Sequence, residues 1–196
     1  MRKFINKSLI MLYLSFLLLS TTSCAPNLKD RVKAFQEAYN SHDVEKELSL
    51  CEEDLRFEIV GESVTEGKEE LRKLCEMGAI LNDHLTLTDL KVSGDTVTCR
   101  LKEHNDWFKA GGIDAVYYES AQFTFKNGLI KEVRSKYTQD TARSLKEFHA
   151  SFGKWGSEKR SQELAELAPE GKLTKENVSR LLTLVREWRE ETEEEK

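Results

Sequence analysis

Positive charge, proline and metal-binding motifs are all scarce in this chain. Its 196 residues include two prolines, and 30 Lys and Arg residues are outnumbered by 35 Asp and Glu, which gives a net charge of −5 at pH 7. A negative chain does not attract nucleic acid or an anionic membrane surface, so neither is expected as a partner. No CxxC or HxxxH spacing occurs. We therefore predict no metal site and no cofactor.

Cysteine is also sparse, and its number limits disulfide pairing. Cys24 lies beside an N-terminal apolar run, which leaves Cys51, Cys75 and Cys99. Three cysteines cannot all pair within one chain, so a disulfide framework is excluded. We expect buried thiols, with a single disulfide bridge as the alternative.

The apolar run at the N-terminus is too short to span a bilayer comfortably, which takes roughly 20 apolar residues. Three basic residues precede residues 9–19, and the small residues 20–23 then lead to Cys24. A positive start, a short apolar stretch and a small-residue site are typical of an export signal. The site resembles the lipobox of bacterial lipoproteins, in which the cysteine becomes a lipidated N-terminus, although Thr21 stands where Leu is usual.

From this pattern we predict a signal peptide over 1–23 and lipidation of Cys24, which would attach the protein to a membrane of the bacterial cell envelope. The alternative is cleavage after Ala25 by ordinary signal peptidase, because Ser23-Cys24-Ala25 also fits a small-x-small site. That alternative gives a secreted or soluble periplasmic protein.

The next part of the chain is predicted to be an α+β domain over 24–138. Apolar residues at helical spacing predict three helices, and alternation of apolar and polar residues predicts five strands. The helices are expected over 28–41, 43–50 and 68–78, and the strands over 55–60, 84–92, 96–104, 115–126 and 129–137. This order indicates helices that cover one face of a curved antiparallel sheet.

Residues 139–196 are predicted to be a C-terminal helical extension. Helices are expected over 140–155 and 157–168, and a third is expected to begin at Thr174 and end near Glu194. The apolar stripe of the last helix must be buried against the sheet domain or against a second copy. Trp155 and Trp188 are expected to dock these helices.

Several segments of the α+β domain resemble the nuclear-transport-factor-2-like superfamily, which includes SnoaL-like proteins and ketosteroid isomerases. They are Tyr39-Asn40-Ser41-His42-Asp43, residues 50–57, Val60-Gly61-Glu62 with Gly67, and the late strand with its turn, residues 122–130. The resemblance implies a cone-shaped curved antiparallel sheet with the N-terminal helices on its concave side. The fold alone does not indicate an activity, because this scaffold carries many functions.

The resemblance also locates the positions of the isomerase groups. The phenol position falls on Phe35, the second donor on Ala121, and the general base on Glu58 or Ile59. Alternation with Leu55 and Phe57 points Ile59 inward. All three groups are then missing, and since loss of even one oxyanion donor costs about 2.7–4 kcal/mol of transition-state stabilisation, isomerase activity is not expected.

Other polar residues are candidates for chemistry in such a cavity. Glu119 and Tyr117 share strand parity with Ala121, and Glu103 shares parity with the apolar face of the preceding strand. Two close carboxyls would raise one pKa and supply a general acid or base. The structural alternative is that Glu103 and Glu119 are solvated or paired with cations.

The first hypothesis is a protein that binds a small apolar molecule or a peptide without catalysis. The alternatives are an enzyme that uses Glu103, Glu119 and Tyr117 or Tyr39 for proton transfer, and an envelope interaction module in which the C-terminal helices plug the cone. The outer sheet face is a candidate homodimer surface, with a solvated face as the alternative. The predicted ligand-binding residues are Phe35, Tyr39, Phe57, Ile59, Ala121 and Phe123.

Overall fold

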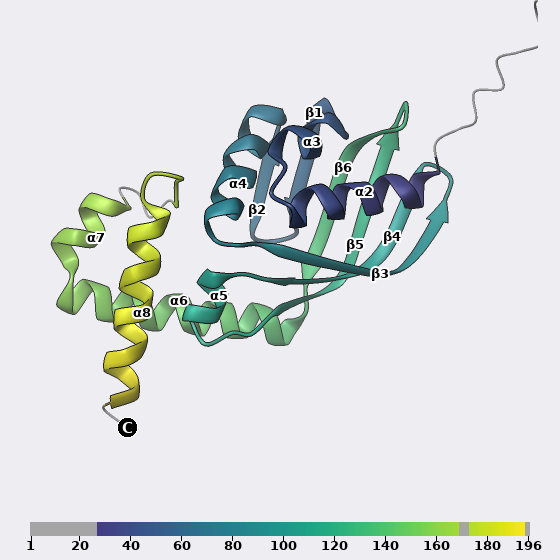
Figure 1. Cartoon of the computed structure of the whole chain (residues 1–196). Coiled ribbons are helices and arrows are strands. Elements are labelled where there is room, and N and C mark those ends of the chain that lie inside the picture. The colour runs from purple at the N-terminus through teal and green to yellow at the C-terminus, as the bar shows by residue number, and fades with distance from the viewer. Residues whose placement is uncertain (1–26, 169–172, 195–196) are drawn as a thin grey trace, which may run out of the picture.

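A single curved, unclosed sheet of six strands organises the first part of the molecule, which is seen in a computed structural model that describes residues 27–168 and 173–194 (Figure 1). Three helices lie on one face of the sheet: α2 (Leu28–Asn40), α3 (Val44–Ser49) and α4 (Lys68–Ile80). The strands are β1 (Cys51–Ile59), β2 (Ser63–Glu66), β3 (His84–Ser93), β4 (Thr96–His104), β5 (Val116–Lys126) and β6 (Leu129–Tyr137).

The first two helices begin where the sequence supplies a capping side chain. The side-chain amide oxygen of Asn27 accepts a hydrogen bond from the backbone N–H of Lys29, and the Asp43 carboxylate accepts one from the backbone N–H of Lys46. Such side chains satisfy N–H groups that the first helical turn leaves unpaired. Along α2 the buried residues recur at helical spacing, so that this face packs against the sheet.

The order of the strands is β2-β1-β6-β5-β4-β3, and every neighbouring pair is antiparallel except β1 with β6. The predicted α+β fold with a curved sheet is confirmed. Two details differ from the expectation. Strand β1 begins at Cys51 rather than at residue 55, and the short strand β2 extends β1 through an antiparallel pairing that the sequence pattern did not indicate.

A β-bulge in β5 reverses the predicted orientation of two candidate residues. Tyr118 pairs with Tyr137 and Ser120 pairs with Lys136, so Glu119 is an extra residue on β5. Because one inserted residue shifts the alternation, Tyr117 and Glu119 are exposed whereas Tyr118 is buried. The expectation that Tyr117 and Glu119 share the inner face of Ala121 is therefore wrong.

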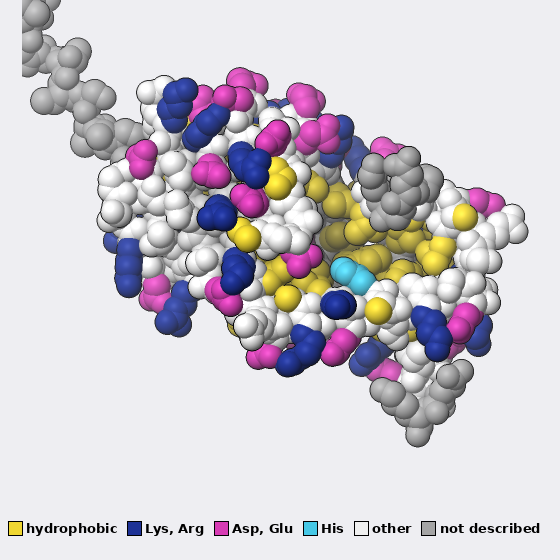
Figure 2. Space-filling view, turned by 180° about the vertical axis from the view of Figure 1, so that it is seen from behind, with side chains coloured by type: hydrophobic (Ala, Val, Ile, Leu, Met, Phe, Trp, Pro, Cys, Tyr) yellow, Lys and Arg dark blue, Asp and Glu magenta, His cyan; other side chains and the backbone are white. Residues whose placement is uncertain are grey.

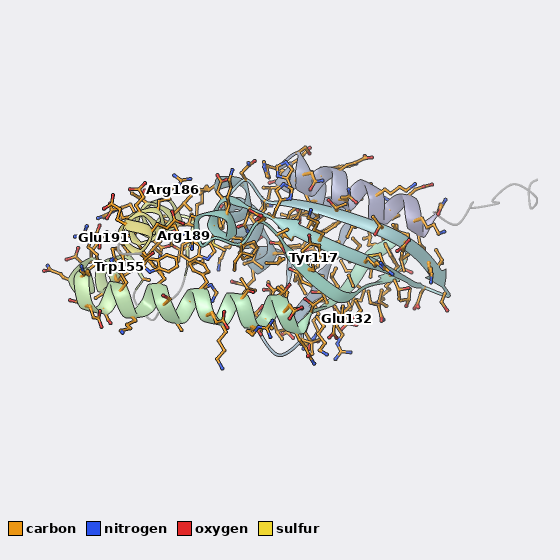
Figure 3. All side chains as sticks on the ribbon, turned by 90° about the horizontal axis from the view of Figure 1, so that it is seen from below. Tyr117, Glu132, Trp155, Arg186, Arg189 and Glu191 are labelled. Atoms are coloured by element: carbon orange, nitrogen blue, oxygen red, sulfur yellow. The ribbon has the colours of Figure 1, made fainter. Side chains whose placement is uncertain are left out.

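The C-terminal helices form a second core beside the sheet. This part consists of α6 (Gln139–Lys159), α7 (Ser161–Leu167) and α8 (Val178–Glu194), and it packs against the short helix α5 (Asp106–Ala110), where only a loop was expected. Trp155 and Trp188 are buried in this core, and the Trp155 indole N–H donates to Glu191 Oε2 at 2.8 Å (Figure 3). Helix α8 begins four residues later than predicted, because Thr174 and Asn177 form a turn before it.

The cysteine expectation holds for the part of the chain that the structure describes. Cys51, Cys75 and Cys99 are buried free thiols. The predicted signal segment and Cys24 lie outside the described residues. None of the described helices combines the length and the apolar character that crossing a membrane requires.

Candidate functional site

A cavity of about 160 Å³ lies between the sheet and the helices that cover it. Most of its lining is apolar, and side chains from α2, α3, α4 and five of the strands contribute to it. Its size is close to that of an engineered protein cavity of roughly 150 Å³ that accommodates benzene. The apolar lining residues are Phe57, Ile59, Leu71, Leu74, Cys75, Met77, Leu85, Leu101, Phe123 and Val133.

The structure places most of the predicted ligand-binding residues at this cavity. Tyr39, Phe57, Ile59 and Phe123 line it, whereas Phe35 and Ala121 are buried in the same core without lining it. The Phe35 ring instead packs edge-on against the ring of Phe123, with the centroids 5.7 Å apart. Phe35 therefore supports the cavity wall from behind.

The predicted pair of carboxyls, Glu103 and Glu119, does not form. Glu103 lines the cavity, but the Glu119 carboxylate lies on the outer face, 2.8 Å from the ammonium group of Lys136. Tyr117 is 52% exposed and packs beside Lys102, 5.8 Å from the ring centre to the ammonium nitrogen (Figure 3). Of Glu103, Glu119 and Tyr117, Glu103 alone faces the cavity, and Tyr39, the alternative to Tyr117, also lines it.

Glu103 is held by the tyrosine that the bulge turns inward. The Tyr118 hydroxyl donates a hydrogen bond of 2.5 Å to Glu103 Oε2, and the ring of Tyr118 packs against Tyr137 at 4.7 Å between centroids. Burial raises the pKa of Glu103 well above its ordinary value, and the nearby Asp83 carboxyl raises it further. The hydrogen bond from Tyr118 opposes both effects without cancelling them, so the pKa of Glu103 remains above that of an ordinary carboxyl.

A second carboxyl at the cavity, the half-buried Asp83, lies in the connection between α4 and β3. Burial raises its pKa above the ordinary value, while hydrogen bonds from Asn105 and Tyr39 lower it. Its Oδ1 atom is buried without a hydrogen-bond partner among the described residues. The sequence offered no signal for this residue, because it belongs to no periodic segment.

Glu47 on α3 supplies a third carboxyl to the cavity and is only 3% exposed. Burial raises its pKa to about 7, although a hydrogen bond from the Cys75 thiol opposes the shift. Burial and Glu47 also raise the pKa of the Cys51 thiol to about 12, which keeps that thiol protonated. The signal for Glu47 in the sequence is weak, because α3 has six residues, although Glu47 lies next to the buried Leu48.

These groups give the cavity an apolar body and a polar end. Tyr39 lines the cavity together with the three carboxyls. Burial raises the pKa of Tyr39 most, and the charges of Glu103, Asp83 and Glu47 raise it further. No Lys, Arg or His from the described ranges lines the cavity. Within those ranges, no group of three or more His, Cys, Asp or Glu is arranged to hold a metal ion. The site can therefore donate, accept and store protons.

A wider groove of about 910 Å³ adjoins the cavity, since Ile59 lines both. One side of the groove is formed by α6, which contributes Leu145, Lys146 and His149, and Phe108 contributes another apolar surface. Figure 2 shows hydrophobic side chains in a hollow on the rear face of the molecule. The groove lies between the edge of the sheet domain and α6.

Comparison with known proteins supports the family resemblance. A family model described as a SnoaL-like domain matches residues 32–133, which is slightly more than half of the chain. This segment extends from α2 to β6 and contains Glu47, Asp83 and Glu103. No curated protein matches the chain.

Solved structures share the fold at low sequence identity. An NTF2-like protein of unknown function from Cytophaga hutchinsonii is 14% identical with a TM-score of 0.50, and covers 60% of this chain and 95% of its own. The epoxide hydrolase/cyclase-like enzyme SalBIII, described in pyran ring formation in the polyether salinomycin, is 19% identical with a TM-score of 0.52, covering 58% and 92%. An LEH-like epoxide hydrolase from M. tuberculosis is 18% identical with a TM-score of 0.50, covering 62% and 91%.

Proposed function

This chain belongs to the SnoaL-like domain family, and we propose that it binds a small, largely apolar molecule in the cavity of its curved sheet without transforming it. The observation that carries the proposal is the cavity itself. It is enclosed by the sheet and three helices, it has the volume of a ligand with one ring, and its apolar body ends in a few polar groups. Small-molecule sites in proteins typically combine these features.

The test is a thermal-shift and NMR titration of the protein with a panel of small aromatic and aliphatic compounds. A ligand that binds only the folded state raises the unfolding temperature. Leu101→Trp would replace a leucine side chain of the cavity lining with a bulkier indole ring and should abolish the ligand-induced rise in unfolding temperature. Val92→Trp is the matched control, because Val92 lies on β3 and is 46% exposed. Absence of binding across the panel, or equal binding by the Leu101→Trp protein, would contradict the proposal.

A second candidate function is proton-transfer catalysis, and it is favoured by the contact between Tyr118 and Glu103 inside the cavity. A carboxyl whose pKa lies near neutrality can act as a general base or acid. In this candidate mechanism the carboxyl that lies near Glu103 is Asp83 and not Glu119, which the sequence had suggested. Small hydrophobic ketones would exchange the hydrogen beside the carbonyl for deuterium in D₂O, as followed by NMR. Glu103→Gln should abolish this exchange and Glu119→Gln should retain it; exchange no faster than in buffer would exclude this candidate.

The interaction-module hypothesis has less support. It requires the C-terminal helices to fill the cone, but among the described residues none from α6, α7 or α8 lines the cavity. Trp155 and Trp188 lie in the second core instead.

The proposal includes export and attachment to the bacterial cell envelope through lipid on Cys24, with secretion or a soluble periplasmic form as the alternative. Labelling with an alkyne fatty acid should mark the wild-type protein and leave a Cys24→Ser variant unlabelled.

We also propose a homodimer through the outer sheet face, which exposes Arg100, Lys102 and Gln122. Sedimentation equilibrium tests this association, and a monomer at high concentration would contradict it.

A further inference from the structure

We propose that the ligand of the cavity is a small primary amine with an aromatic or branched aliphatic body. This inference rests on the proposed function and narrows it to one ligand class. The charged groups that line the cavity in the described part of the chain are the three carboxyls Glu47, Asp83 and Glu103. A ligand that enters this space meets three carboxyl groups and no Lys, Arg or His side chain from the described lining, and an ammonium group complements such a set.

The Asp83 carboxyl supplies an independent reason for a ligand that donates a hydrogen bond. Its Oδ2 atom lies over α4, where a Cβ added to Gly78 would come within 2.8 Å of it. Its Oδ1 atom is buried and has no partner among the residues described. An acceptor without a donor costs free energy, so a ligand N–H that came within hydrogen-bond distance of this carboxyl would remove that cost. An ether or an ester has no donor to offer.

The walls of the cavity also suit a cation. Tyr39, Phe57, Tyr118 and Phe123 present aromatic rings to the same space that holds the carboxyls. The face of an aromatic ring attracts an ammonium group, most strongly where water is excluded. The same rings accommodate the apolar body of the ligand. A volume near 160 Å³ limits that body to about one ring.

Basic side chains are found outside the cavity, in the adjoining groove. Arg143 and Lys146 line the groove together with the acidic residue Glu62, and the Arg143 guanidinium lies 2.6 Å from Asp140. A carboxylate ligand would therefore find partners in the groove but none in the cavity. This distribution of charge separates an amine from an acid of the same shape.

Binding of an ammonium group should release protons. The groups that face the carboxyls are the phenols of Tyr39, Tyr118 and Tyr137 and the Cys75 thiol, while His42 and His84 act on Asp83 from outside the lining. A bound cation favours the ionised form of Glu103 and Asp83, so that protons held by these carboxyls are displaced. Affinity for an amine should rise with pH between about pH 6 and pH 8.

The experiment is isothermal titration of the full protein with three compounds of similar shape: phenethylamine, phenethyl alcohol and phenylacetate. We expect phenethylamine to bind at least about tenfold more tightly than the alcohol, and phenylacetate to bind the cavity more weakly than either. Asp83→Asn and Glu103→Gln should each weaken amine binding by roughly ten- to a hundredfold, while binding of the alcohol changes less than about twofold. Glu119→Gln, on the outer face, is the matched control.

The outcomes distinguish this inference from the proposed function. If the alcohol binds as tightly as the amine, or if amine affinity does not depend on pH and on Asp83 and Glu103, the amine inference is overturned and the proposed cavity function stands. If no compound binds the wild-type protein, both fail. Retained binding of the alcohol by each variant shows that the cavity has remained folded.

Discussion

The two hydrophobic cores of this protein are built differently, although they adjoin each other. The core under the sheet encloses an open space lined by three carboxyls, of which Glu47 is buried and Asp83 and Glu103 are half-buried. The core of the C-terminal helices is filled with aromatic rings, among them Trp107, Phe148, Phe152, Trp155 and Trp188. A Cβ added to Gly156 there would lie 2.1 Å from Leu164 Cδ1, whereas the sheet core leaves about 160 Å³ unfilled.

Close packing is the rule in protein interiors, so the unfilled core is the exception that needs a reason. Buried carboxyls destabilise a fold unless they are partnered. The sheet core has both an unfilled volume and carboxyl groups in its lining, and each of these lowers stability. The helical core has less of either. The difference is what the proposed ligand-binding function requires, because a site for a ligand must leave space unfilled, whereas a core that only stabilises the molecule need not.

The largest expected effect is loss of packing in the helical core. Trp188 is 5% exposed and contacts the rings of Phe148 and Phe152. Trp188→Ala should lower the free energy of unfolding by about 3–5 kcal/mol, measured by urea denaturation. Val92→Ala, at an exposed position, should change it little. Since Trp188 does not line the cavity, the folded fraction of the variant should bind ligand with wild-type affinity; a binding defect would mean that the two cores do not act separately.

The next effect concerns the carboxyls that distinguish the sheet core. The pKa of Glu47 rises from an ordinary 4.5 to about 7 in the folded state, so the folded protein holds this proton more tightly than the unfolded chain does. Stability should therefore fall as the pH rises from about 4.5 to about 7, by roughly 3 kcal/mol from this group.

Urea midpoints at several pH values measure this dependence. Glu47→Gln should remove the part of the slope that Glu47 contributes and should stabilise the protein above about pH 7. The exposed Glu119→Gln should leave the slope unchanged. An identical slope in the wild-type and Glu47→Gln proteins would show that Glu47 is not the group that titrates.

A smaller effect is expected from the hydrogen bond at the polar end of the cavity. Tyr118→Phe removes the hydroxyl that donates to Glu103 and should destabilise the protein by about 1–3 kcal/mol above neutral pH, where Glu103 is most ionised. Tyr117→Phe provides the comparison, because the neighbouring Tyr117 is exposed. Equal unfolding midpoints for the two variants would contradict the inward position of Tyr118.

The smallest effect belongs to the outer face of the sheet. The side chains of Lys136 and Glu119 are 54% and 41% exposed, and ion pairs of this kind contribute little. Glu119→Gln should change the unfolding free energy by less than about 0.5 kcal/mol and leave ligand binding intact. A larger change would indicate that Glu119 takes part in a buried contact, such as a dimer interface.

Alternation of apolar and polar residues predicts which way a side chain points only where the strand pairing is regular. Alternation correctly indicated that Phe57, Ile59 and Phe123 point into the sheet core, because β-strands place alternate side chains on opposite faces. It failed at Tyr117 and Glu119, because a single inserted residue in β5 shifts the register of everything before it. The bulge arises from the way β5 pairs with β6, and no residue type in the sequence of β5 indicates it.

The polar end of the cavity was harder to predict for the same reason. Glu103 was identified from its strand parity, but its true neighbour, Asp83, comes from the connection between α4 and β3, which the pairing of β3 with β4 brings beside it. Glu47 lies on a six-residue helix that is too short for a strong periodic signal. Their approach depends on how the helices pack over the sheet, which local propensities do not specify.

Local patterns were enough to indicate most of the helices and strands, the α+β class and the family resemblance, because periodicity and turn residues act over short distances, but they missed β2 and α5. The export signal stays a prediction that rests on residues 1–24 alone. Tertiary structure alone decided which carboxyls share the cavity and which tyrosine faces them. That outcome depends on strand register and helix packing, since side chains distant in the chain become neighbours only after the sheet has curved around them.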